Sequence, residues 1–176
     1  MIHPHQSPAD RHAHTGDRQC PFAVIVGCSD SRVSPEVVFD QGIGDLFDCR
    51  VAGTVIDTPV TGSIEYAIEH FHAPLIVVLG QENCGAVKAA LAALDPGGSL
   101  PEASIGGLIR EIVPNVRGIT GTTPADRLAK AVRANAEAGA ATLRLSPFVK
   151  RTKATVIAAY YELGPGTVTW AGSAGA

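Results

Sequence analysis

Short apolar runs alternate with segments of helical spacing along most of the chain. Runs typical of β-strands occupy residues 22–27, 46–51, 75–79, 154–161 and 166–170, and segments typical of helices occupy residues 35–39, 62–70, 84–94 and 123–145. Strands that alternate with helices in this way favour an α/β fold with a mostly parallel sheet flanked by helices. The glycine-rich turn at residues 164–166 predicts that the last strand pairs antiparallel at one edge of the sheet.

Length and composition predict one domain. At 176 residues and 18.2 kDa the chain is large enough to bury a core. We expect a polar N-terminal arm over residues 1–20, followed by a single α/β domain over residues 21–176. The four histidines of the arm (His3, His5, His12 and His14) fit no helical face, which favours a solvated arm over a metal site. Hydrophobic residues make up 45% of the chain and charged residues 18%, which leaves room for a subunit interface, although burial within one chain would explain the same composition.

Charge and cysteine content exclude several classes of protein. The net charge of −3 argues against nucleic acid as the main partner, because phosphate binding needs a basic face. No apolar run reaches the roughly 18 residues that span a membrane, and residues 1–8 lack the apolar core of a signal peptide. The four cysteines, at positions 20, 28, 49 and 84, are too few for a disulfide scaffold and indicate metal ligands or core thiols. We therefore expect a cytoplasmic protein.

The strand predicted at residues 46–51 carries one cysteine and one arginine of interest. Its alternation places Leu46, Asp48 and Arg50 on one face and Phe47, Cys49 and Val51 on the other. Cys49 therefore points with the apolar set and is predicted to be a core thiol. Arg50 lies at the carboxyl end of the strand, where it can line a cleft.

Polar and sulfur-bearing side chains follow two of the apolar strands. Cys28, Asp30 and Arg32 come after the first strand, and Gln81 and Cys84 come after the third. In open α/β sheets the carboxyl ends of parallel strands hold the site, so we expect these side chains to converge. Two thiolates and one further ligand leave a fourth zinc position for water, whose pKa the metal lowers to about 7. Asp30 is placed either to ligate zinc or to accept a hydrogen bond from the bound hydroxide, and Arg32 can pair with Asp30 and hold it off the metal.

Other interpretations of this cluster fit the residues less well. The stretch from Gly80 to Gly85 follows a strand and opens a helix, but a phosphate-binding loop needs its lysine at once, and here two residues intervene before Lys88. A thiol nucleophile needs a histidine within reach. His70 and His72 precede the third strand and lie at its opposite end, roughly 17 Å away at about 3.3 Å per residue, so they can neither activate a thiol nor supply a metal ligand. A surface ion pair beside two core cysteines remains the alternative without a site.

The residues around these positions resemble the β-class carbonic anhydrases. The likeness covers residues 28–33, which match the family's Cys-x-Asp-x-Arg signature, and residues 81–89, which resemble its His-x-x-Cys-Gly signature. It also covers residues 39–47, 50, 52–53 and 63–67, whereas Val51 and Thr54 stand where the family usually has asparagine. It weakens after about residue 95 and returns faintly near residues 133–135.

The resemblance implies a parallel-sheet fold, zinc held by Cys, His and Cys, and reversible hydration of CO2 to bicarbonate and a proton. It also implies an obligate oligomer, which we expect to be a homodimer or homotetramer. The site residues carried over are the zinc ligands Cys28 and Cys84, the dyad Asp30 and Arg32 that gates the metal, and the substrate-binding residues Gln41 and Gly53. In the family, the glutamine that Gln41 matches often comes from the neighbouring subunit.

Gln81 stands where the family has its histidine ligand. Its amide oxygen leaves the charge of the site unchanged but is a poorer donor to zinc than imidazole. We therefore expect either a closed site, in which Asp30 swings in as a further ligand and no reactive water remains, or loss of zinc. The segment before the first strand is also shorter than in the family, which predicts a weaker oligomer.

Three functional hypotheses follow from these residues. The first is a zinc-dependent β-type carbonic anhydrase that tolerates Gln81. The second is a catalytically inactive family member that uses the cleft for binding or regulation, and the third is a hydrolase of a related small molecule such as carbonyl sulfide. The family likeness and the retained Cys28, Asp30, Arg32 and Cys84 favour the first, whereas the ligand chemistry of Gln81 favours the second.

Overall fold

The computed structural model describes residues 6–13, 16 and 19–171. In chain order the elements are α1 (Pro8–Ala13), β1 (Ala23–Gly27), α2 (Pro35–Val38), β2 (Leu46–Arg50), the 3-10 turn η1 (Ala52–Thr54), α3 (Thr58–Phe71), β3 (Leu75–Gln81), α4 (Gly85–Leu94), α5 (Ala103–Val116), α6 (Pro124–Leu145), α7 (Pro147–Thr152), β4 (Thr155–Glu162) and β5 (Thr167–Trp170). Within the described ranges, no helix has both the length and the apolar character needed to cross a membrane.

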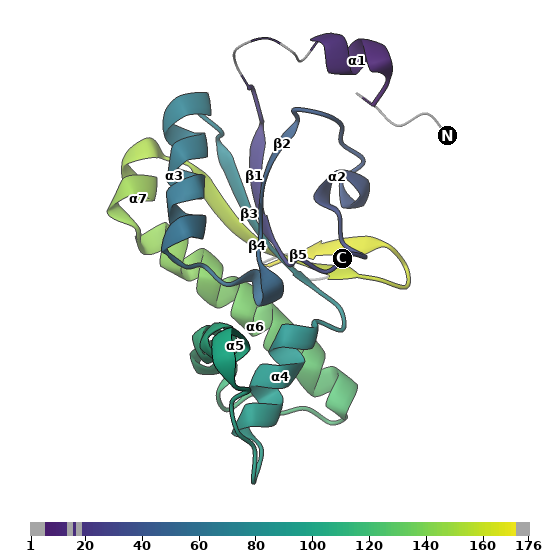
Figure 1. The fold of residues 1–176 in the computed structure, drawn as a ribbon, viewed down its shortest axis with the longest axis vertical. Coiled ribbons are helices and arrows are strands. Elements are labelled where there is room, and N and C mark those ends of the chain that lie inside the picture. The colour runs from purple at the N-terminus through teal and green to yellow at the C-terminus, as the bar shows by residue number, and fades with distance from the viewer. Residues whose placement is uncertain (1–5, 14–15, 17–18, 172–176) are drawn as a thin grey trace.

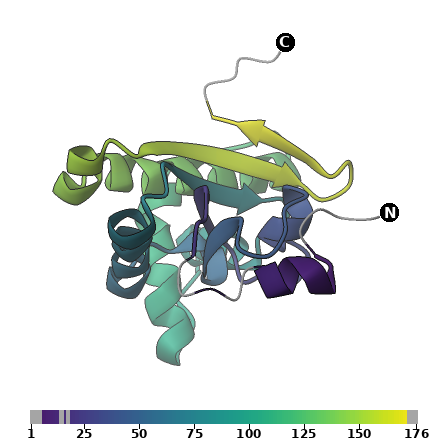
Figure 2. The same ribbon diagram turned by 90° about the horizontal axis from the view of Figure 1, so that it is seen from above.

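The strands form one sheet in the order β2-β1-β3-β4-β5 (Figure 1). β1 pairs in parallel with β2 and β3, β3 pairs in parallel with β4, and β5 pairs antiparallel with β4. Seen from above, the strands run from β2 at one edge to the β4–β5 hairpin at the other (Figure 2). The predicted α/β fold, with a mostly parallel sheet and an antiparallel edge strand, is confirmed.

Helices cover the two faces of the sheet unequally. α3, α6 and α7 pack on one face, in the cluster that contains Val26. On the opposite face, side chains of the sheet that include Ile25 pack with Val38 of α2 and with Leu163 in the turn between β4 and β5. A third cluster lies beyond the carboxyl ends of β1 and β3, where α4, α5 and α6 meet, and it contains Cys28 and Cys84. The two cysteines are therefore part of a packed apolar layer at the predicted end of the sheet.

Helix boundaries differ from the sequence predictions in several places. α3 begins at Thr58, earlier than the predicted Gly62, because the Asp57 side chain accepts a hydrogen bond from the N–H of Val60 (2.9 Å) and caps the helix. Over residues 97–123, where little periodicity was expected apart from residues 105–113, the chain forms α5. α7 was not predicted, because Pro147 was interpreted as the end of a helix rather than the first residue of another.

The predicted N-terminal arm contains the short helix α1. Ser7 Oγ accepts the N–H of Asp10 (3.1 Å) and Asp10 Oδ2 accepts the N–H of Ser7 (2.9 Å), which is a reciprocal cap. Gln6 Nε2 donates to the carbonyl of Gln41 (3.2 Å), so the arm contacts the loop after α2. Of the arm's histidines, His12 is exposed, and His3, His5 and His14 lie outside the described residues.

Candidate metal centre

Two parallel strands bring the predicted cluster together. Gly27 at the end of β1 lies opposite Leu79 of β3, so Cys28 follows β1 beside the last residues of β3. Gln81 is the last residue of β3, and Cys84 is the N-cap residue of α4. The exposed fraction is 6% for Cys28 and 1% for both Gln81 and Cys84. The cluster is therefore shielded from bulk water by the packing of α4, α5 and α6.

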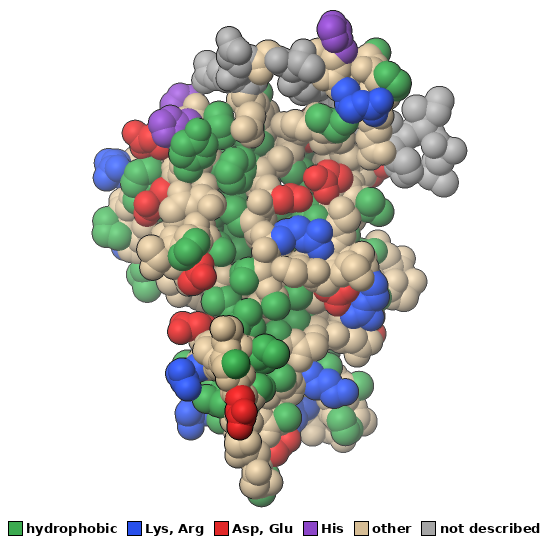
Figure 3. All heavy atoms as spheres, in the orientation of Figure 1, with side chains coloured by type: hydrophobic (Ala, Val, Ile, Leu, Met, Phe, Trp, Pro, Cys, Tyr) green, Lys and Arg blue, Asp and Glu red, His purple; other side chains and the backbone are tan. Residues whose placement is uncertain are grey.

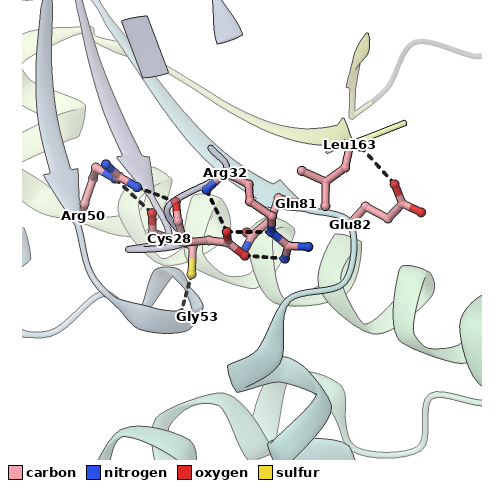
Figure 4. A network of polar contacts seen from close by, with 8 residues as sticks. Cys28, Arg32, Arg50, Gly53, Gln81, Glu82 and Leu163 are labelled. Carbon is pink, nitrogen blue, oxygen red and sulfur yellow. Dashed lines mark hydrogen bonds and ion pairs between the residues drawn. The ribbon is translucent and has the colours of Figure 1, made fainter. Parts of the chain in front are cut away.

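The turn before Cys84 is anchored by Glu82. Its N–H donates to the carbonyl of Tyr161 (2.8 Å), and its side-chain Oε2 accepts the N–H of Leu163 (2.9 Å), as Figure 4 shows for the second contact. Asn83 adopts a left-handed conformation with a φ of 56°, which asparagine tolerates better than most residues. Sequence analysis did not identify Glu82, because its partner Leu163 is 81 residues away along the chain.

The two thiols contact each other, and their pKa values move apart. A hydrogen bond from Cys84 to the Cys28 sulfur is the main reason that the pKa of Cys28 is lowered and that of Cys84 is raised. The N–H of Gly53, 3.3 Å from Cys28 Sγ, and the amide of Gln81 lower the pKa of Cys28 further, whereas burial opposes the shift. Cys28 is therefore the thiolate of the pair, and thiolate is the form that binds a metal.

Arg32 holds Asp30 in a bidentate ion pair. Arg32 Nε donates to Asp30 Oδ1 (2.9 Å) and Nη2 donates to Oδ2 (2.6 Å), and the Arg32 backbone N–H also donates to Oδ1 (3.0 Å). The guanidinium is the main cause of an Asp30 pKa far below the usual range. The Asp30 side chain is 14% exposed, whereas that of Arg32 is 52% exposed. The carboxylate is thus an ionised acceptor at the rim of the cluster.

Strand β2 contributes Arg50 to the cluster but not Cys49. Arg50 Nε donates to the carbonyl of Cys28 (3.0 Å) and Nη2 donates to the carbonyl of Asp30 (2.6 Å) (Figure 4). The guanidinium therefore holds the backbone of Cys28 and Asp30 in place. Cys49 is buried in the cluster on the α3 side of the sheet, and burial raises its pKa to about 11. The prediction of a core thiol at Cys49 is confirmed.

The amide of Gln81 faces the cluster with its nitrogen. Nε2 lies 3.5 Å from Asp30 Oδ2 and also forms a hydrogen bond with the Cys28 sulfur. Because a carboxylate and a thiolate can only accept hydrogen bonds, the NH2 end of the amide has to face them. Oε1 is buried and has no hydrogen-bond partner among the described residues. A half-turn about the last side-chain torsion would exchange the oxygen and nitrogen without moving the rest of the residue.

The donor set limits how a metal can be held. Among the described residues, no group of three or more His, Cys, Asp or Glu side chains is arranged to hold a metal ion. As the side chains are placed, with Asp30 held by Arg32, a third donor beside Cys28 and Cys84 would be of another type, and Gln81 Oε1 is a buried oxygen without a partner among the described residues. With its amide turned, these three side chains provide two thiolates and one neutral oxygen, a set that zinc accepts.

The other predicted site residues are distributed as follows. Gly53 lies against the Cys28 sulfur. Gln41 lies after α2, where its Nε2 donates to the carbonyl of Phe39 (2.8 Å) and its own carbonyl accepts from the arm. His72 follows α3 and precedes β3, which places it at the opposite end of the sheet from Cys84, as the sequence predicted.

Comparison with known proteins identifies the family. The solved structure of a Coccomyxa β-carbonic anhydrase in complex with acetazolamide superposes with a TM-score of 0.80 at 26% identity, and the match covers 93% of this chain and 78% of that one. A family model described as carbonic anhydrase matches residues 23–168. The chain belongs to the β-carbonic anhydrase family.

Curated relatives within the β-carbonic anhydrase family match about two thirds of the chain. Carbonic anhydrase 2 of Mycobacterium tuberculosis is 54% identical over 114 residues, which cover 65% of this chain and 52% of that protein. A carbonic anhydrase of Mycolicibacterium smegmatis is 49% identical over 115 residues, which cover 65% of this chain and 55% of that protein. The chain thus spans about half the length of the curated relatives it matches.

Proposed function

We propose that this member of the β-carbonic anhydrase family catalyses the zinc-dependent, reversible hydration of CO2 to bicarbonate and a proton. The observation that supports the proposal best is the buried side-chain amide of Gln81, which faces the pair of thiols and whose Oε1 has no partner among the described residues, so that the amide can turn without losing a contact at that oxygen. That oxygen stands at the position of the family's histidine ligand and is a neutral donor, as imidazole is. When bound, zinc supplies the Lewis acid that activates water at neutral pH.

Each residue of the cluster has a role in this proposal. Cys28 and Cys84 would hold zinc as thiolates, and the amide oxygen of Gln81 would be the third donor. Asp30 presents Oδ2 toward the cluster as a hydrogen-bond acceptor for the reacting oxygen's proton. Arg32 keeps that carboxylate from becoming a ligand, because the closed form with Asp30 on the metal would have to break two charge-assisted hydrogen bonds of 2.9 and 2.6 Å.

The substrate side of the site involves an oligomer in this proposal. In this proposal Gln41 helps to position substrate in a neighbouring subunit, as the matching glutamine does in the family. Within its own chain its Nε2 donates to the carbonyl of Phe39 (2.8 Å). An aromatic surface formed by Phe47, Tyr66 and Phe71 lies between β2 and α3. The ring centroids of Phe47 and Phe71 are 6.0 Å apart, and those of Tyr66 and Phe71 are 5.5 Å apart. Hydrophobic side chains are visible on this face in Figure 3. A homodimer or homotetramer would cover such a surface.

Zinc content and CO2 hydration, measured together on four proteins, test the proposal. The proteins are the unmodified chain, Gln81→His, Cys84→Ser and the matched control Cys20→Ser. We expect the unmodified chain and Cys20→Ser, whose cysteine is exposed, to hold about one zinc per chain and to hydrate CO2. Cys84→Ser should lose both properties, and Gln81→His should bind zinc more tightly because imidazole is the better donor.

The possible outcomes separate the three hypotheses. Zinc binding without CO2 hydration in the unmodified chain would refute the proposal and favour the inactive binding or regulatory protein. Zinc and activity only in Gln81→His would show that the glutamine abolishes the enzyme. Hydrolysis of carbonyl sulfide without CO2 hydration would favour the third hypothesis.

A further inference from the structure

Gly53 is held in place from three directions. Its N–H donates to Cys28 Sγ (3.3 Å), and its carbonyl accepts Nδ2 of Asn135 (2.8 Å). Its φ of 69° lies in the left-handed region, and a Cβ at this position would lie 2.4 Å from Ile112 Cδ1 and 2.9 Å from Ala86 Cβ. The peptide that faces the Cys28 sulfur therefore has little freedom to move.

The residue that fixes the carbonyl of Gly53 is Asn135 on α6. Asn135 is buried, with 6% of its surface exposed, on a helix face that is otherwise apolar. The carbonyl of Gly53 can only accept, so Nδ2 has to face it, and Oδ1 then accepts Nδ2 of Asn115 from α5 (3.0 Å). Asn115 and Asn135 thus connect two helices to the loop beside the metal centre.

We propose that Asn135 is a positioning residue of the metal centre, which orients the Gly53 N–H toward the Cys28 sulfur and is itself supported by Asn115. The proposal deepens the proposed function and rests on it where zinc affinity is concerned. Residues that hydrogen-bond to metal ligands orient those ligands, and their loss typically lowers metal affinity or activity about 10- to 100-fold. Asn135 acts one step further out, through the backbone of Gly53. It holds the carbonyl on one side of the Gly53 Cα, and the N–H that faces the sulfur lies on the other side.

A purely structural role for Asn135 would leave the position of Gly53 unchanged. Asn115 and Asn135 line a cavity of about 240 Å³ together with Thr54 and Glu111. Water from such a cavity could hydrogen-bond to the Gly53 carbonyl if the asparagine were removed. What Asn135 provides beyond a water molecule is a fixed direction, because its amide is held by the helix and by Asn115. The two roles therefore differ in the order of the Gly53 N–H, not in whether the carbonyl is satisfied.

The experiment compares Asn135→Asp and Asn135→Ala with the control Arg144→Met. Asn135→Asp keeps the shape of the side chain but turns an acceptor toward the Gly53 carbonyl, and Asn135→Ala removes the contact. Arg144 is on the same helix but donates to strand β4, at the carbonyl of Val156 (3.0 Å), and not to the turn that contains Gly53. Its variant therefore reports a general loosening of α6. Zinc affinity is measured by competition with a chelator, and hydrogen exchange of the Gly53 amide is measured by NMR on the metal-free proteins.

We expect both Asn135 variants to bind zinc about 10- to 100-fold more weakly than the unmodified chain. We also expect the Gly53 amide to exchange roughly five- to tenfold faster in them, with no change in Arg144→Met beyond its effect on global stability. Unchanged Gly53 exchange in both variants would overturn the proposal, whatever the zinc result. If the unmodified chain binds no zinc, the proposed function fails, and faster Gly53 exchange in the metal-free variants would still support the positioning role.

Discussion

The close packing around Gly53 allows a quantitative prediction for Gly53→Ala. The backbone at this residue has a φ of 69°, where an L-amino acid with a Cβ costs about 1–2 kcal/mol. The new methyl would also lie 2.4 Å from Ile112 Cδ1, and Ile112 is fully buried, so it cannot turn into solvent. Overpacking of this kind typically costs about 1–3 kcal/mol. We therefore expect Gly53→Ala to lower the free energy of unfolding by about 2–5 kcal/mol, a large part of the roughly 5–15 kcal/mol of a typical domain.

A second variant separates the steric cost from the backbone cost. Ile112→Val removes the Cδ1 atom nearest to the new methyl and by itself should cost about 0.5–1.5 kcal/mol. In the double variant Gly53→Ala, Ile112→Val, the contact with Ile112 Cδ1 should be relieved while the one with Ala86 Cβ remains, so the two changes should combine to less than the total of their separate costs. The backbone part should remain, because it depends on φ and not on Ile112.

Urea unfolding of the four proteins of this cycle measures the effect. Gly107→Ala is the matched control, because a Cβ at Gly107 meets no atom within 4 Å and the residue lies inside α5. In Gly107→Ala we expect the free energy of unfolding to rise by about 0.5–1 kcal/mol, because the unfolded chain has less conformational freedom. A loss below about 1 kcal/mol in Gly53→Ala, or additive costs in the double variant, would refute the argument from φ and packing.

Two further predictions concern pH and helix capping. Partial burial, with repulsion from Glu36, raises the pKa of Asp48 to about 6. The folded protein therefore holds this proton more tightly than the unfolded chain does. As a result, the free energy of unfolding should fall as pH rises from about 4 to about 6. Asp48→Asn should remove that part of the slope in urea unfolding at several pH values, and an unchanged slope would contradict the assignment. Thr123 Oγ1 accepts the N–H of Asp126 (3.1 Å) at the start of α6, so Thr123→Ala should cost about 1 kcal/mol in thermal or urea unfolding. Ser146→Ala should cost close to nothing, because the Ser146 side chain makes no such bond at α7, and equal costs for the two would contradict the capping argument.

The sequence predicted the sheet and the place of the site because both depend on local pattern. Apolar runs of strand length, separated by helices, leave few arrangements other than a parallel sheet. Once Cys28 and Cys84 follow two such strands, their approach is a consequence of topology. The pairing of Gly27 with Leu79 sets the register that brings Cys28 and Cys84 together. That register follows from the buried faces of both strands.

What the sequence could not predict depends on partners that are distant along the chain. Asn135 and Gly53 are 82 residues apart, and the amide of Gln81 is oriented by Asp30, which is 51 residues away. No spacing rule links such positions, since their approach depends on how α6 packs on the sheet and on the side-chain rotamers chosen there. In the sequence, Asn135 belongs only to the faint resemblance near residues 133–135. A polar residue on an otherwise apolar helix face was the signal that could have drawn attention to it.

The orientation of the Gln81 amide affects both sides of a metal-binding equilibrium. On the bound side, an amide oxygen is a weaker zinc donor than imidazole. On the free side, Nε2 already stabilises the anionic Cys28 and Asp30, and hydrogen bonds to charged groups contribute about 1.5–3 kcal/mol. Zinc has to displace that contact before Oε1 can turn to it, which alone would weaken apparent affinity roughly 10- to 100-fold. Weak zinc binding by the unmodified chain would therefore not by itself show that Oε1 cannot ligate, because part of the loss arises in the metal-free protein.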